Sequence, residues 1–139
     1  MEENLTFASI IKIDDLNNVK FKEFIKESLD LWSSKYLLII KTKTINSLKL
    51  TFYPIKNEEI FKIRIFEENF TEKQINDIVG IIKDLDIIHA SGLTSKGDKF
   101  FYECYLDLYK KNFEKSLKNL KAITKNLKID VIGLKTEKK

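Results

Sequence analysis

The chain is poor in the residues that cross-link a protein, bind metals or interrupt regular structure. Its 139 residues include one Cys, one Pro, four Gly and one His. A single Cys, Cys104, excludes an intrachain disulfide, and His89 has no nearby Cys or second His to give zinc-ligand spacing. We therefore interpret His89 as structural and Cys104 as a buried, inert thiol. The scarcity of Gly and Pro predicts a chain built mostly from regular elements.

Longer patterns are scarce as well. The apolar runs, such as Tyr36–Ile40, are far shorter than a membrane span, and Met1–Phe7 has two acids and no apolar segment typical of a secretory signal. The sequence contains no P-loop, no G-x-G-x-x-G and no G-x-S-x-G. These features predict a cytoplasmic protein without a membrane partner, a bound metal, a cofactor or catalytic residues.

What the sequence does contain is typical of a soluble globular protein. Apolar residues make up 43% and charged residues 33% of the chain, and 25 basic against 21 acidic residues give a net charge of +4. This mild excess permits contact with nucleic acid but does not require it. The length suits one ordinary domain or two very small ones.

The second half has a regular order of predicted elements. Thr71 and Gln74 form a T-x-x-Q capping box at a helix start, and Gly97 supplies a turn between two strands. The predicted elements are the strand Ile60–Glu67, the helix Thr71–Leu85, the strands Ile87–Thr94 and Lys99–Asp107, the helix Asn112–Leu127 and the strand Ile129–Leu134. This βαββαβ order predicts an α+β, ferredoxin-like two-layer sandwich of two helices on a four-stranded sheet.

The first half predicts a small β-α-β-β segment. The predicted elements are a strand at Leu5–Ile13, a helix at Phe21–Trp32 with Asn17 or Asn18 as its cap, and a hairpin of Tyr36–Thr42 and Ser47–Pro54. Pro54 is expected to end the last strand because it lacks an amide proton. We place one domain at residues 1–55 and the second at 58–136.

The strand Lys99–Leu108 carries apolar groups on both faces. Phe101 and Tyr105 point one way, whereas Phe100, Tyr102, Cys104 and Leu106 point the other. A sheet that is wet on one side alternates with polar residues, so both faces are expected to be covered. The helices cover one face, and the first half or a second copy covers the other. A homodimer is the economical solution.

Four stretches of the second half carry a family resemblance. They are I-F-K-I-R-I-F-E at Ile60–Glu67, T-E-K-Q-I-N-D-I-V-G-I-I-K-D-L-D-I-I-H-A at Thr71–Ala90, D-K-F-F-Y-E-C-Y-L-D-L at Asp98–Leu108 and I-D-V-I-G-L-K at Ile129–Lys135. In this order they resemble an ACT-type regulatory domain. The resemblance implies a homodimer that binds a small effector such as an amino acid at the subunit interface. The family usually has a Gly between its first strand and helix, where this chain has Glu68-Asn69-Phe70.

A ligand is most expected at this first strand–helix turn. Asn69, Phe70 and Thr71 occupy it and open a helix whose amide groups favour anions. We therefore predict these three residues as the ligand-binding site.

A second resemblance lies in the first half. V-K-F-K-E-F-I-K-E-S-L-D-L-W-S-S-K-Y-L-L-I-I at Val19–Ile40 is similar to the strand–short helix–strand signature of AbrB-like swapped-hairpin regulators. Lys22, Asp30 and Ser34 stand where that family has a Pro and two Gly. The resemblance implies DNA binding, whereas an ordinary β-α-β-β segment is the alternative.

Nucleic-acid binding has two candidate lysine groups. One is Lys12, Lys20 and Lys22 of the first half, and the other is Lys118, Lys121, Lys125 and Lys128, which form one basic stripe along the end of the last predicted helix. The alternative for the stripe is an ordinary solvent-exposed helix face, since lysines are favoured near a helix C-terminus. Aromatic residues at Phe61, Phe66, Phe101, Tyr102 and Tyr105 also invite comparison with an RNA-recognition sheet, but the spacing of that motif is missing.

Three functions follow in order of preference. The first is a non-enzymatic regulatory or sensor homodimer, the second a nucleic-acid-binding transcription regulator, and the third a structural adaptor in a protein complex. Fold similarity alone does not choose among them.

Overall fold

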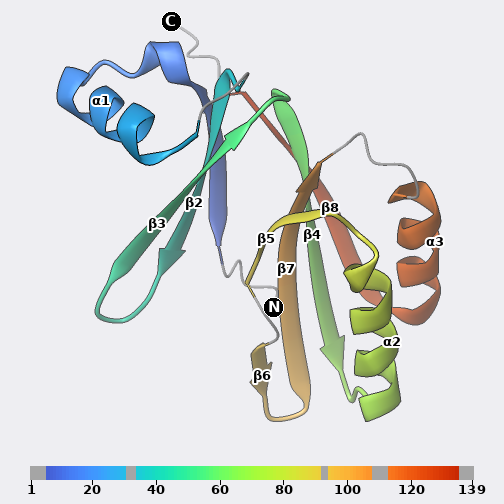
Figure 1. The fold of residues 1–139 in the computed structure, drawn as a ribbon. Helices are drawn as coiled ribbons and strands as arrows, with labels where there is room; N and C mark the ends of the chain where they lie inside the picture. Colours follow the sequence, from blue (N-terminus) through green and yellow to red (C-terminus); the bar gives the residue numbers. More distant parts are fainter. Residues whose placement is uncertain (1–5, 31–33, 92–93, 108–112, 135–139) are drawn as a thin grey trace, which may run out of the picture. The chain divides into compact units, whose positions relative to one another are not determined.

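The structure, a computed structural model, describes residues 6–30, 34–91, 94–107 and 113–134, which form three α-helices and eight strands. The predicted α+β class is therefore confirmed. Contacts divide the chain into two compact units. Among the described residues, the C-terminal unit comprises those within Ile60–Val131, and the N-terminal unit comprises those up to Glu59 together with Ile132, Gly133 and Leu134. Figure 1 shows the elements of both units.

The N-terminal unit is a three-stranded antiparallel sheet with one helix. Its strand order is β1-β2-β3, and Leu134 adds an isolated parallel bridge to Ile10. The elements are β1 (Phe7–Lys12), the 3-10 turn η1 (Ile13–Asp15), α1 (Val19–Ser28), β2 (Tyr36–Lys43) and β3 (Leu48–Ile55). The predicted hairpin corresponds to β2 and β3. Pro54 does not end β3, which continues to Ile55, and an edge strand is where a sheet accepts Pro.

Helix α1 starts where its cap predicts and ends earlier than its apolar pattern predicts. The Asn18 side chain accepts a hydrogen bond from Phe21 N at 3.0 Å, which confirms Asn18 as the N-cap. Leu29 is already extended, with φ −120°, so the helix stops at Ser28. Trp32, the predicted end, lies outside the described residues. The extended Leu29 packs on the small core formed by Ile13, Ile25 and Leu37.

The C-terminal unit is a sheet with the order β5-β7-β4-β8, and β6 pairs with β7. The elements are β4 (Glu59–Glu68), α2 (Glu72–Lys83), β5 (Ile87–Ala90), β6 (Thr94–Lys96), β7 (Lys99–Asp107), α3 (Phe113–Ile123) and β8 (Asn126–Gly133). Figure 1 shows α2 and α3 on the same side of this sheet. The single strand predicted at Ile87–Thr94 is in fact β5 and the start of β6, with residues 92–93 between them outside the described residues.

The larger core lies between this sheet and its helices. Ile63 and Ile65 of β4 both point toward α2 and α3. On the neighbouring strand β7, Ile63 pairs with Cys104 and Ile65 pairs with Tyr102. The buried members of this core are Ile63, Ile65, Ile78, Ile82, Phe100, Tyr102, Cys104, Leu106 and Leu120. Side chains at alternate positions of β4 and β7 therefore face away from the helices.

The last helix is shorter than its pattern predicts. It ends at Ile123, not Leu127, and β8 begins at Asn126. The Thr124 hydroxyl donates to Leu120 O at 2.7 Å, and the Glu67 carboxylate of β4 accepts the next backbone amide, Lys125 N. Because a distant carboxylate takes up the amide at this point, the chain leaves the helix before its apolar pattern ends.

Candidate functional site

The predicted ligand turn connects β4 to α2, and each of its residues has a structural contact. Asn69 has a left-handed backbone, with φ 54°, and its N–H donates to Asp98 O at 2.9 Å. Phe70 packs edge-on against Phe100, with ring centroids 5.1 Å apart. Thr71 caps α2 by accepting a hydrogen bond from Gln74 N at 3.1 Å. Asn is the residue after Gly that best tolerates this backbone, so Asn69 suits the turn.

The capping box at this turn is formed in one direction. Thr71 Oγ1 accepts from Gln74 N as predicted, but the Gln74 side-chain amide donates to Ile123 O at the end of α3, 3.0 Å away. This bond joins the start of α2 to the end of α3. Ligand binding by the three turn residues remains a prediction. Their contacts within the unit account for these residue types without a ligand.

The predicted lysine stripe does not lie on one helix. Lys118 and Lys121 belong to α3, Lys125 follows its end, and Lys128 lies in β8. The earlier end of α3 is the physical reason, because a stripe needs one continuous helix. All four lysines are exposed.

The N-terminal lysines are similarly dispersed. Lys12 ends β1 and Lys20 lies in the first turn of α1, and both are exposed. Lys22 is half-buried, and its Nζ lies 4.0 Å from an Asp14 carboxylate oxygen. These positions neither exclude nor favour nucleic acid by themselves.

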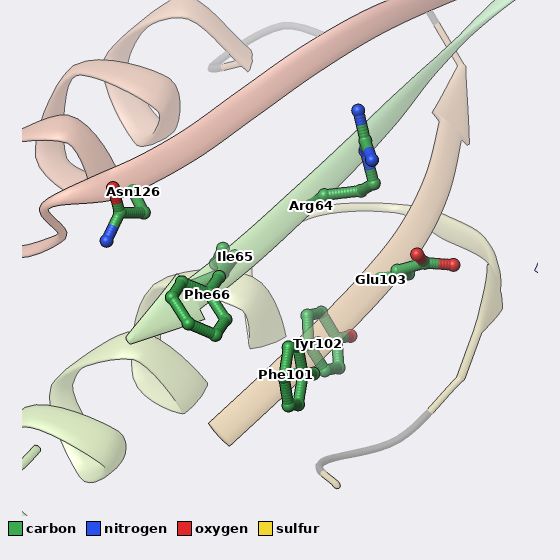
Figure 2. Close-up of a pocket in the computed structure, with 7 residues that line it drawn as sticks. All are labelled: Arg64, Ile65, Phe66, Phe101, Tyr102, Glu103 and Asn126. Carbon is green, nitrogen blue, oxygen red and sulfur yellow. The ribbon is translucent and has the colours of Figure 1, made fainter. Parts of the chain in front are cut away.

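The aromatic side chains of β4 and β7 divide between the two faces of the sheet. Phe61 and Tyr102 pack in the core beneath the helices, and Tyr105, on the other face, is fully buried. Phe66 and Phe101 are half-buried on the face away from the helices and pack on each other at 4.9 Å between ring centroids (Figure 2). The cavity that they line has a volume of about 10 Å³, which is room for about one water molecule. It offers no space for a nucleic-acid base.

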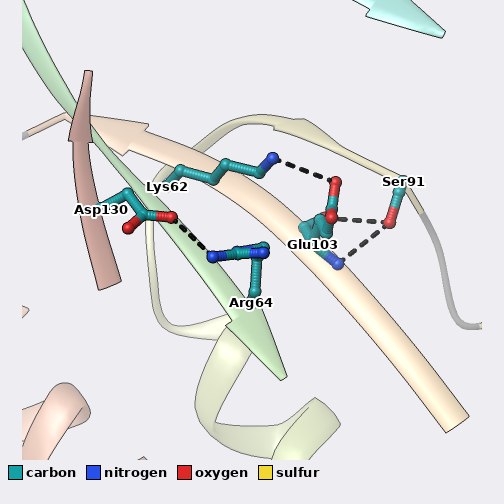
Figure 3. Close-up of polar contacts among 5 residues, drawn as sticks. All are labelled: Lys62, Arg64, Ser91, Glu103 and Asp130. Atoms are coloured by element: carbon teal, nitrogen blue, oxygen red, sulfur yellow. Dashed lines mark hydrogen bonds and ion pairs between the residues drawn. The ribbon is translucent and has the colours of Figure 1, made fainter. Parts of the chain in front are cut away.

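Two ion pairs lie on this same face (Figure 3). Lys62 Nζ is 3.5 Å from Glu103 Oε1, and both side chains are almost fully buried, at 5% and 3% exposure. Arg64 contacts Asp130 at 3.1 Å, with Asp130 partly exposed. The Ser91 hydroxyl contacts the backbone N–H and C=O of Glu103 at 3.0 and 3.2 Å and holds that stretch of β7 in place.

Burial controls the chemistry of Lys62 and Cys104. Desolvation lowers the Lys62 pKa from its ordinary value of 10.5, while the Glu103 carboxylate opposes this shift. Burial also raises the pKa of the Cys104 thiol from 9.0 to about 12, so the nucleophilic thiolate is disfavoured. His89 lies beside Tyr105, with ring centroids 6.1 Å apart. Each of the three side chains therefore has a neighbour or an environment within the C-terminal unit that affects its chemistry.

A surface that the sequence did not single out lies at the free end of the N-terminal sheet. Phe7, Lys41 and Leu50 are register partners across the three strands, as are Lys43 and Leu48 across two. These five residues share one face, which we call the hairpin surface. Figure 1 shows α1 at the opposite end of the sheet from the β2–β3 loop. Helix α1 therefore covers Ile39 and Phe52 but leaves the hairpin surface bare.

The hairpin surface exposes large apolar side chains. Phe7, Leu48 and Leu50 are 51%, 59% and 47% exposed, and Ile45 in the adjoining loop is fully exposed. The Lys41 ammonium lies 5.5 Å from the centre of the Phe7 ring, within cation–π range. On this surface Lys41 and Lys43 of the middle strand lie between Phe7 on one side and Leu48 and Leu50 on the other.

Charge of one sign marks the same segment. Between Asp30 and Glu58 the sequence has five lysines and no acidic residue: Lys35, Lys41, Lys43, Lys49 and Lys56. This acid-free stretch, together with leucines that alternate with Lys49 and Thr51, is the sequence signal that points to this surface. Alternation alone predicted a hairpin but not which part of it α1 covers.

Comparisons of the chain with protein-family models, with curated proteins and with solved structures find no match. In the described part of the chain, no helix combines the length and apolarity needed to span a membrane. Within those residues, His, Cys, Asp and Glu also form no group of three or more that is suited to a metal ion. The hairpin surface is therefore the feature on which a functional proposal rests.

Proposed function

We propose that the protein is a non-enzymatic regulatory protein that acts by binding another polypeptide chain at the hairpin surface. The carrying observation is that Phe7, Leu48 and Leu50 each expose about half of their side chain on one sheet face, with Leu48 and Leu50 next to each other on β3 and Lys41 between Leu50 and Phe7. Exposed apolar side chains gathered with polar ones on one face are a feature of protein-binding sites. The second chain is either another copy, which makes a homodimer, or a different protein.

We also infer that the C-terminal unit is a ferredoxin-like, ACT-like domain. Its element order, the sheet order β5-β7-β4-β8 and the placement of both helices on one face support this assignment. An effector of this unit is expected at Asn69, Phe70 and Thr71, where α2 begins. A thermal-shift screen with the twenty amino acids tests the effector, because a ligand of the folded state raises the melting temperature. A melting temperature unchanged by all of them contradicts it.

Site-specific photo-cross-linking in the cells that make the protein tests binding at the hairpin surface. A photoreactive amino acid at position 48 is expected to give a discrete adduct with a polypeptide. The matched control is position 19, because Val19 is an apolar residue of the same unit that is 68% exposed on α1. Adducts with polypeptide at neither position, or equally at both, contradict the proposal. Light scattering of the purified chain then shows whether the adduct partner is a second copy.

Nucleic-acid binding stays the alternative because of one observation. The acid-free stretch places exposed Lys41, Lys43 and Lys49 on the β2–β3 hairpin, and a two-stranded ribbon fits a nucleic-acid groove. This function predicts an electrophoretic shift of duplex DNA that weakens steeply with salt. Adducts with nucleic acid at position 48 support it at the expense of the leading proposal.

A further inference from the structure

We infer that the outer edge of β3 accepts an extended segment of a different protein, in which apolar and acidic residues alternate. This inference rests on the proposed binding of a polypeptide at the hairpin surface and adds the chemistry of the partner. The mode is strand addition, in which main-chain hydrogen bonds give affinity and alternate side chains give specificity.

The edge of β3 is open for pairing. β3 pairs with β2 on one side, and no strand among the described residues pairs with its other side. Its eight residues extend over about 26 Å, long enough for several main-chain hydrogen bonds. An edge of this length is a template for another strand unless it is covered or blunted.

The backbone groups that face outward follow from the hairpin register. Thr44 N donates to Ser47 O at 2.9 Å, so this opposed pair is a hydrogen-bonded one. Such pairs alternate along an antiparallel ladder with pairs whose N–H and C=O groups point away from the partner strand. The outward positions of β3 are therefore Leu48, Leu50, Phe52 and Pro54. Pro54 also lies at an outward position but has no N–H to donate, so an added strand pairs with the Leu48–Phe52 part of the edge.

The side chains of the outward positions determine what the added strand carries on one face. Leu48 and Leu50 belong to the hairpin surface and are about half exposed. Residues of an added strand on this face lie beside them at the spacing of neighbouring strands, about 5 Å. Apolar residues there complete the burial of Leu48 and Leu50.

Charge determines what the added strand carries on the other face and at its ends. Lys49 points to the opposite face of β3 from Leu48 and Leu50, and it is exposed. Acidic residues that alternate with the apolar ones lie beside it. Lys41 and Lys43 lie one strand further in, and their charge adds to the positive field that an acidic segment meets. Apolar and acidic residues in alternation therefore match both faces.

The same charges disfavour a second copy as the occupant. Each copy has five lysines and no acid between Asp30 and Glu58, so pairing of two β3 edges brings together segments of like charge. Like charges across neighbouring strands destabilise the pairing and suppress the wrong partner. An acidic segment reverses the sign of this interaction.

A selection experiment tests the chemistry of the partner. A library of random peptides of about twelve residues, longer than β3, is displayed and selected on the immobilised full chain. The recovered sequences are expected to alternate apolar residues with Asp or Glu. Recovered sequences without acidic residues, or no recovery at all, overturn the inference.

Variants then locate the binding of a recovered peptide. Fluorescence anisotropy is expected to show at least about tenfold weaker binding for Lys43→Glu with Lys49→Glu, and for Leu50→Ser. Lys73→Glu with Lys115→Glu is the matched control, because it makes the same change of charge at exposed positions of α2 and α3 and leaves affinity within about twofold. Methylation of alternate peptide amides is expected to abolish binding, because it blocks main-chain pairing. Equal losses in the control, or full binding by the methylated peptide, overturn the inference.

The outcomes separate this inference from the proposed function. A photo-adduct at position 48 with a second copy supports a homodimer and the proposed function, but it overturns the acidic partner. An adduct with nucleic acid, or no adduct at all, overturns both.

Discussion

The two units of this chain differ in what they keep from water. The C-terminal unit buries nine residues in one core and, on the other face of its sheet, buries the charged pair Lys62 and Glu103 as well. The N-terminal unit has three buried residues in the core beneath α1, buries Ile10, Leu38 and Ile40 on the other face of its sheet, and leaves Leu48 and Leu50 about half exposed. The C-terminal unit therefore has the larger core beneath its helices, whereas the N-terminal unit has the smaller core and the exposed leucines on which the proposed function rests.

The largest expected effect tests the buried charge of the C-terminal unit. Lys62→Met leaves the Glu103 carboxylate buried without its cation, so the free energy of unfolding is expected to fall by about 3–5 kcal/mol. Urea denaturation followed by circular dichroism measures this loss.

The control for this prediction removes both charges. Lys62→Met with Glu103→Leu is expected to regain most of the lost stability, because hydrophobic residues of similar volume replace a buried pair at little cost. A double variant that is as unstable as the single one shows that volume, not charge, decides at this site.

Matched core truncations compare the two units directly. Ile63→Ala in the large core is expected to cost about 2–5 kcal/mol, because tightly packed neighbours leave a cavity behind. Ile25→Ala in the small core is expected to cost less, since partly exposed neighbours such as Phe21 and Leu29 move into the space. Urea denaturation of each variant gives both numbers. An equal or larger loss at Ile25 breaks the comparison.

Local sequence patterns predicted the elements whose signals are local. Asn18 and Thr71 cap the helices that they precede, and β2 and β3 pair as a hairpin, because caps and turns depend on residues three or four positions apart. The end of α3 was wrong because Glu67, far away in sequence, accepts the Lys125 amide. No window of neighbouring residues contains that carboxylate.

The candidate site was missed for a similar reason. The alternation of Leu48 and Leu50 with Lys49 is visible in the sequence, but it is equally typical of a strand whose apolar face is covered. The exposure of this end depends on where α1 stops and which strand residues it covers. Likewise, the pairing of Lys62 with Glu103 depends on the register of β4 against β7. The one sequence feature that marks this surface is the absence of acidic residues from the hairpin. That feature bears on which partner the surface suits, and it says little about the fold.

The thiol of Cys104 gives a smaller effect that depends on pH. Its folded-state pKa is about 12, above its ordinary value of 9.0, so above pH 9 the folded state holds a proton that the unfolded state loses. This contribution to stability is complete below pH 9 and is lost as the pH rises toward 12. Relative to Cys104→Val, the wild type is therefore expected to lose up to about 1.4 kcal/mol per pH unit above pH 9. Parallel urea curves at pH 8 and pH 10 measure the difference, and a constant difference contradicts it.

The β4–α2 turn provides an effect of about 1 kcal/mol. Asn69→Ala places a side chain without local hydrogen bonding at φ 54°, and it is expected to cost about 1 kcal/mol of stability. Asn69→Gly is the control and is expected to retain or raise stability, because Gly adopts this backbone without strain. Thermal unfolding compares the two. If both variants lose the same stability, the Asn69 side chain matters for its contacts and not for its backbone.

The smallest expected change in stability tests whether the exposed leucines of the N-terminal unit serve folding or binding. Leu48→Ser with Leu50→Ser removes apolar side chains that are already about half exposed, so the stability of the isolated chain is expected to change by no more than about 0.5 kcal/mol per site. The same double variant is expected to lose the position-specific polypeptide contact of the hairpin surface. A large loss of stability in the isolated chain would assign these leucines to the fold of their own unit. Unchanged stability with lost binding assigns them to a partner, because apolar area that contributes nothing to folding is then retained for what covers it.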